Sequence, residues 1–218
     1  MNIADYILKD FNPLHINNTI KEALVLCEGL TLTHIPIIKD GIFAGTISQS
    51  DLLTIENQEQ QLSDFVAIFE YFQVNAKESV LELLKNFANN DTNSIPVIVE
   101  KKYMGYFELN AILDVFSQSP FLNTNGFILN IEKNKKDYSF SEVTQIAESN
   151  NGLLLGCYIS NQTTDKVELT LKIASDKINE IIQTFRRYNY TIITEHKDDY
   201  YLEELKNRSE YLQKFLNT

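Results

Sequence analysis

The sequence predicts an α+β protein built from two unlike halves. In the first half, a unit of helix, strand, turn, strand and helix occurs twice, 60 residues apart. In the second half, the hydrophobic periodicity predicts the order strand, helix, strand, strand, helix, strand. A chain of 218 residues leaves room for two or three small domains, each with a core of its own.

Composition and charge describe a folded protein with an acidic surface. Hydrophobic residues make up 44% of the chain and charged residues 22%, as is typical of globular proteins. The net charge of −11 makes the average surface repel nucleic acids and anionic lipids, so we expect neither as a partner. The first residues resemble neither a secretory nor a transit signal, and no apolar run approaches the roughly 20 residues that span a bilayer. We therefore expect a cytoplasmic protein without membrane contact.

The two cysteines and three histidines predict neither a disulfide nor a metal site. Cys27 and Cys157 lie among apolar residues, where free cysteine behaves as a small hydrophobic side chain. His15, His34 and His196 are scattered, with no Cys, Asp or Glu at the spacing of metal ligands. No nucleophile, base and oxyanion-binding group can be assembled from these residues. The sequence therefore predicts no catalytic residue, no metal and no cofactor.

The repeat in the first half is marked by a proline and a glycine at equal spacing. Pro36 falls on Pro96, and Gly45 falls on Gly105. The two copies span residues 1–58 and 59–118. An amphipathic helix precedes each marked strand, so each copy predicts the same succession of elements.

Capping and turn residues predict where the elements of each copy begin and end. Thr19 in the first copy and Ser79 in the second are expected helix N-caps. In the first copy, Asp40-Gly41 is expected to turn a hairpin between a buried strand and a second strand, which runs from Ile42 to about Ile47.

A further helix of the first copy is expected to begin at Ser48. Ser48 is a good N-cap, and the free N–H groups of the first turn form a place where a phosphate can sit. Asp51 follows at i+3, so its carboxylate faces the same opening as the hydroxyl. The pair could hold a ribose phosphate. It also fits a helix start without a ligand, since a cap and a first-turn carboxylate each contribute about 1 kcal/mol or less.

The first copy carries the residues of a known family. The run Ile35-Pro36-Ile37, followed by GTISQSD at 45–51, resembles the CBS domain, and the two copies resemble a tandem CBS pair. In that family the paired copies leave clefts that take adenosine-containing ligands. The resemblance implies a phosphate contact from Ser48 and a ribose contact from Asp51, and it places Thr33 and His34 near the base or the ribose. For His34 we favour the alternative, a strand residue that faces partial solvent.

The second copy departs from this pattern. Glu108 stands where the first copy has Ser48, and Ala111 stands where it has Asp51. A carboxylate at the helix start is expected to compete for the N–H groups and to repel a phosphate, and alanine offers a ribose hydroxyl no acceptor. We therefore expect at most one ordinary nucleotide site, in the first copy.

The second half is expected to fold separately. Residues 119–125 lie in a stretch rich in Ser, Asn, Pro and Gly, which predicts a linker. Residues 126–218 are expected to form a domain with a terminal helix. Its βαββαβ order predicts the ferredoxin-like split, with two helices on one face of an antiparallel sheet. The stretch 126–196 resembles the ACT domain, which implies regulation by an amino acid.

The loop after the first strand of this half lacks the glycine that would admit an amino acid's backbone in the ACT family. Lys133, Lys135 and Lys136 make the loop basic, which suits either an anion or a solvated turn. Farther on, an apolar face of the tail (Tyr201, Leu205, Leu212, Leu216) is expected to pack on its own domain or on a second subunit. We favour the second subunit, and hence a homodimer.

Together the two halves resemble acetoin-utilisation-type CBS proteins of bacteria. The resemblance implies a non-catalytic regulatory protein that senses AMP, ATP or a related adenosine nucleotide in the first cleft. Binding would favour one arrangement of the repeats, and the dimer would relay it to a partner protein that the sequence does not identify. Two alternatives stay open: a structural or interaction protein with degenerate ligand sites, and an amino-acid-sensing ACT regulator.

Overall fold

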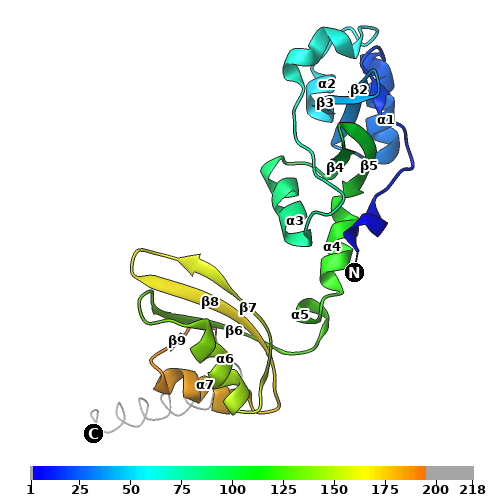
Figure 1. Cartoon of the computed structure of the whole chain (residues 1–218). Coiled ribbons are helices and arrows are strands. Elements are labelled where there is room, and N and C mark those ends of the chain that lie inside the picture. Colours follow the sequence, from blue (N-terminus) through cyan, green and yellow to red (C-terminus); the bar gives the residue numbers. More distant parts are fainter. Residues whose placement is uncertain (1, 195–218) are drawn as a thin grey trace, which may run out of the picture. The chain divides into compact units, whose positions relative to one another are not determined.

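A computed structural model describes residues 2–194 of the chain, which divides into two compact units, residues 1–118 and 119–218 (Figure 1). Both contain helices and sheets, so the α+β class is confirmed. The tail with the predicted terminal helix and dimer face lies outside the described residues. No helix within residues 2–194 is long and apolar enough to cross a membrane.

The first repeat forms its predicted elements around one hairpin. These are α1 (Ile20–Leu30), β2 (His34–Lys39), β3 (Ile42–Ser48) and α2 (Gln49–Leu53), with the flanking pieces η1 (Ile3–Tyr6), β1 (Leu14–His15) and η2 (Leu62–Ile68). Thr19 caps α1 through a capping box. Asp40 and Gly41 form the turn, with φ angles of 51° and 77°, a conformation that Asp and Gly adopt readily. The predicted cap and turn are confirmed.

The second repeat reproduces the first with different turn chemistry. Its elements are α3 (Val80–Asn89), β4 (Ser94–Val99), β5 (Lys102–Glu108) and α4 (Leu109–Ser117). Ser79 caps α3 as predicted, its side chain accepting a hydrogen bond from the Glu82 N–H. The hairpin turn is Glu100-Lys101, with φ angles of 50° and 66°. The register of each hairpin shifts at equivalent points, between residues 37 and 38 and between 97 and 98.

Each hairpin is extended by a segment from outside it. Leu8 pairs with Tyr106 of β5 through two backbone hydrogen bonds of 2.9 and 3.1 Å, and Glu70 pairs with Thr46 of β3 through bonds of 2.8 and 2.9 Å. The residue before each pairing position on the hairpin is a glycine, Gly105 or Gly45, with a φ of 137°. The repeated glycine thus marks the place where a second segment lies against the strand.

The two repeats have separate cores of the same design. Ile35, Ile37 and Ile47 of the first repeat are fully buried, as are Ile95 and Phe107 of the second. In each repeat every second residue of the first hairpin strand packs in a core with helices, Ile35 and Ile37 on β2 and Ile95 and Val97 on β4. The residues between them are also buried, so both faces of these strands are covered. Because the strands are anchored in these cores, the residues at the start of β2 and at the end of β3 have fixed positions.

The second unit contains a four-stranded antiparallel sheet in the order β7-β8-β6-β9. Its elements are α5 (Pro120–Asn123), β6 (Phe127–Asn134), α6 (Phe140–Ser149), β7 (Leu153–Gln162), β8 (Lys166–Ala174), α7 (Ile178–Arg187) and β9 (Thr191–Ile192). The sheet order and strand directions are those of the predicted ferredoxin-like split. Residues of α6 and α7 share a core with the sheet, including Val143, Ile146, Ile181 and Phe185.

Two details of this unit differ from the sequence prediction. The sequence places Asp176 near the cap position of the last helix, but the N-cap of α7 is Lys177, one residue later, and it makes no side-chain capping bond. Within the segment expected to be a linker, residues 120–123 form the short helix α5, and the Phe121 ring lies 6.4 Å from the Tyr158 ring on β7.

Candidate functional site

The four residues singled out by the sequence lie together in one cavity of the first unit. The cavity has a volume of about 430 Å³ and is lined by Thr33, His34, Ser48, Gln49, Ser50, Asp51, Glu70, Asn90 and Asp91. The start of β2, the start of α2, the segment before α3 and the end of α3 all contribute. Both repeats therefore build the cavity, hereafter the first cleft.

Ser48 and Asp51 are bonded to each other at the start of α2. Ser48 is the N-cap, and its Oγ accepts a 3.0 Å hydrogen bond from the Asp51 N–H. The same hydroxyl donates to Asp51 Oδ2 at 2.7 Å and lies 2.9 Å from Ser50 Oγ. The predicted cap is confirmed, and the carboxylate faces the hydroxyl as the i+3 spacing required. Asp51 keeps capacity for a further donor, because a carboxylate accepts about four hydrogen bonds.

The first turn of α2 has fewer free N–H groups than the sequence suggested. The Gln49 N–H donates to the Thr33 carbonyl at 2.7 Å, and the Asp51 N–H is taken by Ser48. The helix has only five residues, which limits its dipole. The backbone at this point therefore offers a phosphate less than the sequence predicted.

Thr33 links the two repeats. Its N–H donates to Asn93 Oδ1 at 2.9 Å, and the Asn93 N–H donates to Thr33 Oγ1 at 3.0 Å. Asn93 is the residue 60 positions after Thr33, so equivalent residues of the two copies pair with each other. Beside them, the Ser94 hydroxyl donates to the His34 carbonyl at 2.8 Å. Thr33 and Asn93, the polar residues that precede β2 and β4, thus join the two repeats at one wall of the first cleft.

His34 is buried rather than facing solvent, with 6% of its surface exposed. Its Nδ1 lies 3.0 Å from Thr33 Oγ1, and its Nε2 lies 3.4 Å from Glu70 Oε1. The ring packs edge-on against Phe72, at 5.4 Å between centroids. The solvent-facing alternative for His34 is wrong. The ring is held on three sides, with a polar edge in the first cleft.

Five lining residues were not among the predicted site residues: Gln49 and Ser50, which lie within the GTISQSD run, and three from other segments. Glu70 comes from the segment that pairs with β3, and Asn90 and Asp91 come from the end of α3 in the other repeat. The described residues lining the cleft thus carry three carboxylates, those of Asp51, Glu70 and Asp91, and neither Lys nor Arg. The field in the first cleft is therefore negative.

The equivalent helix start in the second repeat is built differently from the expectation. Glu108 is the N-cap of α4, yet its side chain makes no capping hydrogen bond. The predicted competition of this carboxylate for the helix N–H groups is therefore wrong. The Leu109 N–H instead donates to the Asn93 carbonyl at 2.9 Å, as Gln49 does to Thr33 in the first repeat. Ala111 offers no acceptor, in keeping with the sequence.

In the basic loop of the second unit, one of the three lysines is already engaged. The Lys133 ammonium contacts the Glu142 carboxylate and lies 4.2 Å from the centre of the Tyr190 ring. Lys135 and Lys136 are exposed. The loop therefore has the character of a structural turn with two solvated charges.

The cysteines lack the character of nucleophiles. Burial raises the pKa of the Cys27 thiol to about 12, with a smaller contribution from Glu28, and burial raises that of Cys157 to about 11. Both thiols are free and stay protonated at neutral pH, whereas the thiolate is the reactive form. Residues 2–194 hold no group of three or more His, Cys, Asp or Glu side chains placed to bind a metal.

Comparison with known proteins identifies the first repeat. Residues 3–57 match the model of the CBS domain family, which confirms the resemblance for that repeat. A comparison with curated proteins gives no match.

Several solved structures resemble about half of the chain. A CBS domain pair/ACT domain protein from Thermotoga maritima has 18% identity and a TM-score of 0.47, covering 53% of this chain and 96% of its own. A putative acetoin utilization protein from Vibrio cholerae has 20% identity and a TM-score of 0.46, covering 53% and 90%. The protein CBSX2, crystallised in complex with AMP, has 15% identity and a TM-score of 0.46, covering 54% and 96%.

Proposed function

We propose that this protein is a non-catalytic cytoplasmic regulator that binds an adenosine nucleotide in the first cleft. One observation carries the proposal: one cavity is lined by Ser48 and Asp51 of the repeat that matches the CBS domain family and by Asn90 and Asp91 of the other repeat. A ligand there contacts both repeats at once. The raised thiol pKa values of the two cysteines support the non-catalytic part of the proposal.

The polar groups of the cleft suit a sugar better than a chain of phosphates. Carboxylates accept hydrogen bonds from ribose hydroxyls, and Asp51 is oriented for this by the Ser48 hydroxyl. Each phosphate group meets the repulsion of Glu70 and Asp91. We therefore propose that AMP binds more tightly than ATP, with the phosphate toward the Ser50 hydroxyl, because the one proton of the Ser48 hydroxyl is already donated to Asp51.

The regulatory step follows from the shared lining. The Thr33–Asn93 bonds fix one arrangement of the repeats, and a ligand that favours this arrangement over another shifts the population between them. We propose that a homodimer relays the shift to a partner protein. A ligand that binds both arrangements equally would have no effect.

Thermal unfolding with a ligand panel tests the proposal. AMP at about 100 times its Kd is expected to stabilise the folded chain by about 2.7 kcal/mol. Replacing Asp51 by alanine should remove most of this gain, whereas Asp114→Ala, an exposed carboxylate on α4, should keep it. ATP should stabilise less than AMP, and Asp91→Asn should narrow that difference because it removes one repelling charge. A flat response to all adenine nucleotides would contradict the proposal.

A second candidate is an interaction protein without a ligand. Apolar side chains stand exposed on the helices of both repeats: Leu53 and Leu113 occupy equivalent positions and are 63% and 44% exposed, and Val25 and Leu81 are 65% and 67% exposed. Such surfaces mark protein contacts when they form a continuous patch. An amino-acid-sensing role for the ACT-like second unit stays a prediction, and amino acids in the same panel test it.

A further inference from the structure

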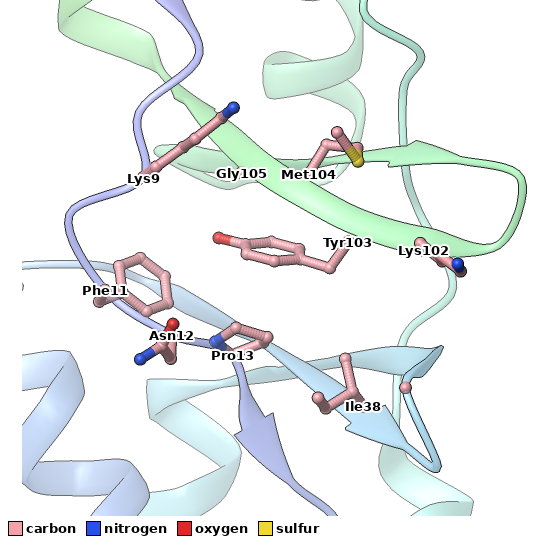
Figure 2. Close-up of a pocket in the computed structure, with 10 residues that line it drawn as sticks. Lys9, Phe11, Asn12, Pro13, Ile38, Lys102, Tyr103, Met104 and Gly105 are labelled. Carbon is pink, nitrogen blue, oxygen red and sulfur yellow. The ribbon is translucent and has the colours of Figure 1, made fainter.

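A second cavity of the first unit lies apart from the first cleft (Figure 2). It has a volume of about 340 Å³ and lies between the N-terminal segment and the hairpins of both repeats. Its principal side chains are Lys9, Phe11, Asn12, Lys102, Tyr103 and Met104. It shares no lining residue with the first cleft, and neither Glu108 nor Ala111 lines it.

The backbone fixes the walls of this cavity. The N-terminal segment is held on β5 by the Leu8–Tyr106 hydrogen bonds. The two hairpins are joined where the Phe43 N–H donates to the Lys101 carbonyl at 2.9 Å. The close approach of the segment depends on Gly105, since a Cβ there would lie 2.3 Å from the Leu8 carbonyl oxygen. The walls of the cavity are therefore set by backbone contacts of the fold.

Aromatic rings form one side of the cavity. Phe11 packs near both Tyr103 and Tyr106, with ring centroids 6.4 and 5.0 Å away. Figure 2 shows the Tyr103 hydroxyl directed toward the N-terminal segment, between Lys9 and Phe11. This oxygen is buried, and no group within residues 2–194 hydrogen-bonds it. Burial raises the pKa of the phenol, so it stays a neutral donor.

The charge of the lining is positive, although the chain as a whole is strongly acidic. Lys9 and Lys102 line the cavity, and none of the described lining residues is an Asp or a Glu. The neighbouring Asp10 accepts a 3.3 Å hydrogen bond from the Tyr106 hydroxyl. A cavity lined by two lysines, an unpaired phenol donor and apolar rings favours an anion with a flat apolar body.

We propose that this cavity is a second ligand site, which binds a small aromatic anion such as a nucleoside monophosphate or an aromatic carboxylate. The Tyr103 hydroxyl donates to the ligand, Lys9 and Lys102 supply the attraction for its charge, and Phe11 contacts its ring. A volume of about 340 Å³ falls at the small end of the roughly 300 to 1,000 Å³ found for ligand pockets. The proposal does not depend on a ligand in the first cleft.

Isothermal titration of the full chain with matched pairs of probes tests the site. The pairs are AMP with adenosine, both titrated into Asp51→Ala so that the first cleft does not contribute, and benzoate and indole-3-acetate with their neutral amides. We expect the anions to bind and their neutral partners to bind at least about 10-fold more weakly, since a charge-assisted contact is lost. Comparing the affinity for AMP with that for the two carboxylates shows whether the site prefers a nucleoside monophosphate or an aromatic carboxylate.

Two variants and their controls assign the binding to this cavity. Tyr103→Phe removes one hydrogen bond and is expected to weaken binding about 3- to 10-fold. Lys9→Met is expected to weaken it similarly and to reduce its dependence on salt. Tyr71→Phe, at a tyrosine that is 71% exposed, and Lys77→Met, at an exposed lysine, should change nothing.

Asp51→Ala separates the two cavities, because it alters the first cleft alone. Binding that persists in Asp51→Ala and weakens in Tyr103→Phe supports the second site. No binding by any anion of the panel, equal binding of the neutral partners, or binding indifferent to Tyr103→Phe and Lys9→Met would overturn it. Tyr103→Phe leaves no group unpaired, so the free variant should melt no lower than the parent, and a loss of binding will not reflect unfolding.

Discussion

Replacing Gly105 by alanine is expected to destabilise the first unit by about 2 to 5 kcal/mol. Two costs add at this position. The φ of 137° is one that residues with a side chain rarely adopt, and the new Cβ would lie 2.3 Å from the Leu8 carbonyl oxygen and 2.5 Å from Ile7 Cγ2. Because one neighbour is backbone, a side-chain rotation cannot relieve the contact. The N-terminal segment would have to leave β5.

Urea unfolding of the parent and two glycine variants measures the effect. Gly41→Ala is the control, because Gly41 also has a positive φ, of 77°, but no atom lies within 4 Å of its added Cβ. Strain alone should cost about 1 to 2 kcal/mol there. Equal losses of unfolding free energy in the two variants would contradict this account. They would mean that the pairing of Leu8 with β5 does not exclude a side chain at position 105.

Truncating Phe185 to alanine is expected to cost the second unit about 3 to 5 kcal/mol. The side chain is fully buried on α7, between the helices and the sheet, and its ring packs edge-on against Tyr190 at 5.4 Å. Loss of the ring removes its transfer free energy and leaves a void that the surrounding strands cannot fill. The loss approaches the whole stability of a small domain, which is about 5 to 15 kcal/mol.

Phe140 supplies the matched control for this truncation. It lies at the start of α6 in the same unit, with 44% of its surface exposed. Chemical denaturation of Phe140→Ala should show a loss below about 1 kcal/mol, as at most surface positions. Similar midpoints for the Phe140 and Phe185 variants would show that the core is not centred on α7.

Local signals in the sequence predicted most elements of the fold. The capping hydroxyls of Thr19 and Ser79 and the turn pair Asp40-Gly41 act through neighbours a few residues away, so the sequence contains what they need. The pairing of Leu8 with β5 could not be predicted in this way, since its partner lies almost a whole unit away along the chain. The short helix α5 was missed because Ser119-Pro120, a helix-start signal, stands among residues typical of linkers.

The sequence predicted only some of the residues of the candidate site. Ser48 and Asp51 were found because cap spacing and family resemblance point to the same residues. Glu70 and Asp91 were missed because tertiary structure, rather than spacing, brings them to the first cleft. One signal was available: Thr33 and Asn93 are equivalent in the repeat, and equivalent residues can meet at an axis relating two copies. The negative charge of the cleft follows from these residues, so the sequence could not suggest the AMP preference that we propose.

The histidine side chains provide the most direct test of binding in the first cleft. His34 lines it, whereas His15 on β1 does not, so each ring reports on a different place. In a titration with AMP followed by NMR of the imidazole nitrogens, we expect the His34 signals to move along a saturating curve while those of His15 stay in place. Asp51→Ala should flatten that curve. If AMP binds the chain and leaves the His34 signals unmoved, or does not bind at all, the first cleft is not a nucleotide site.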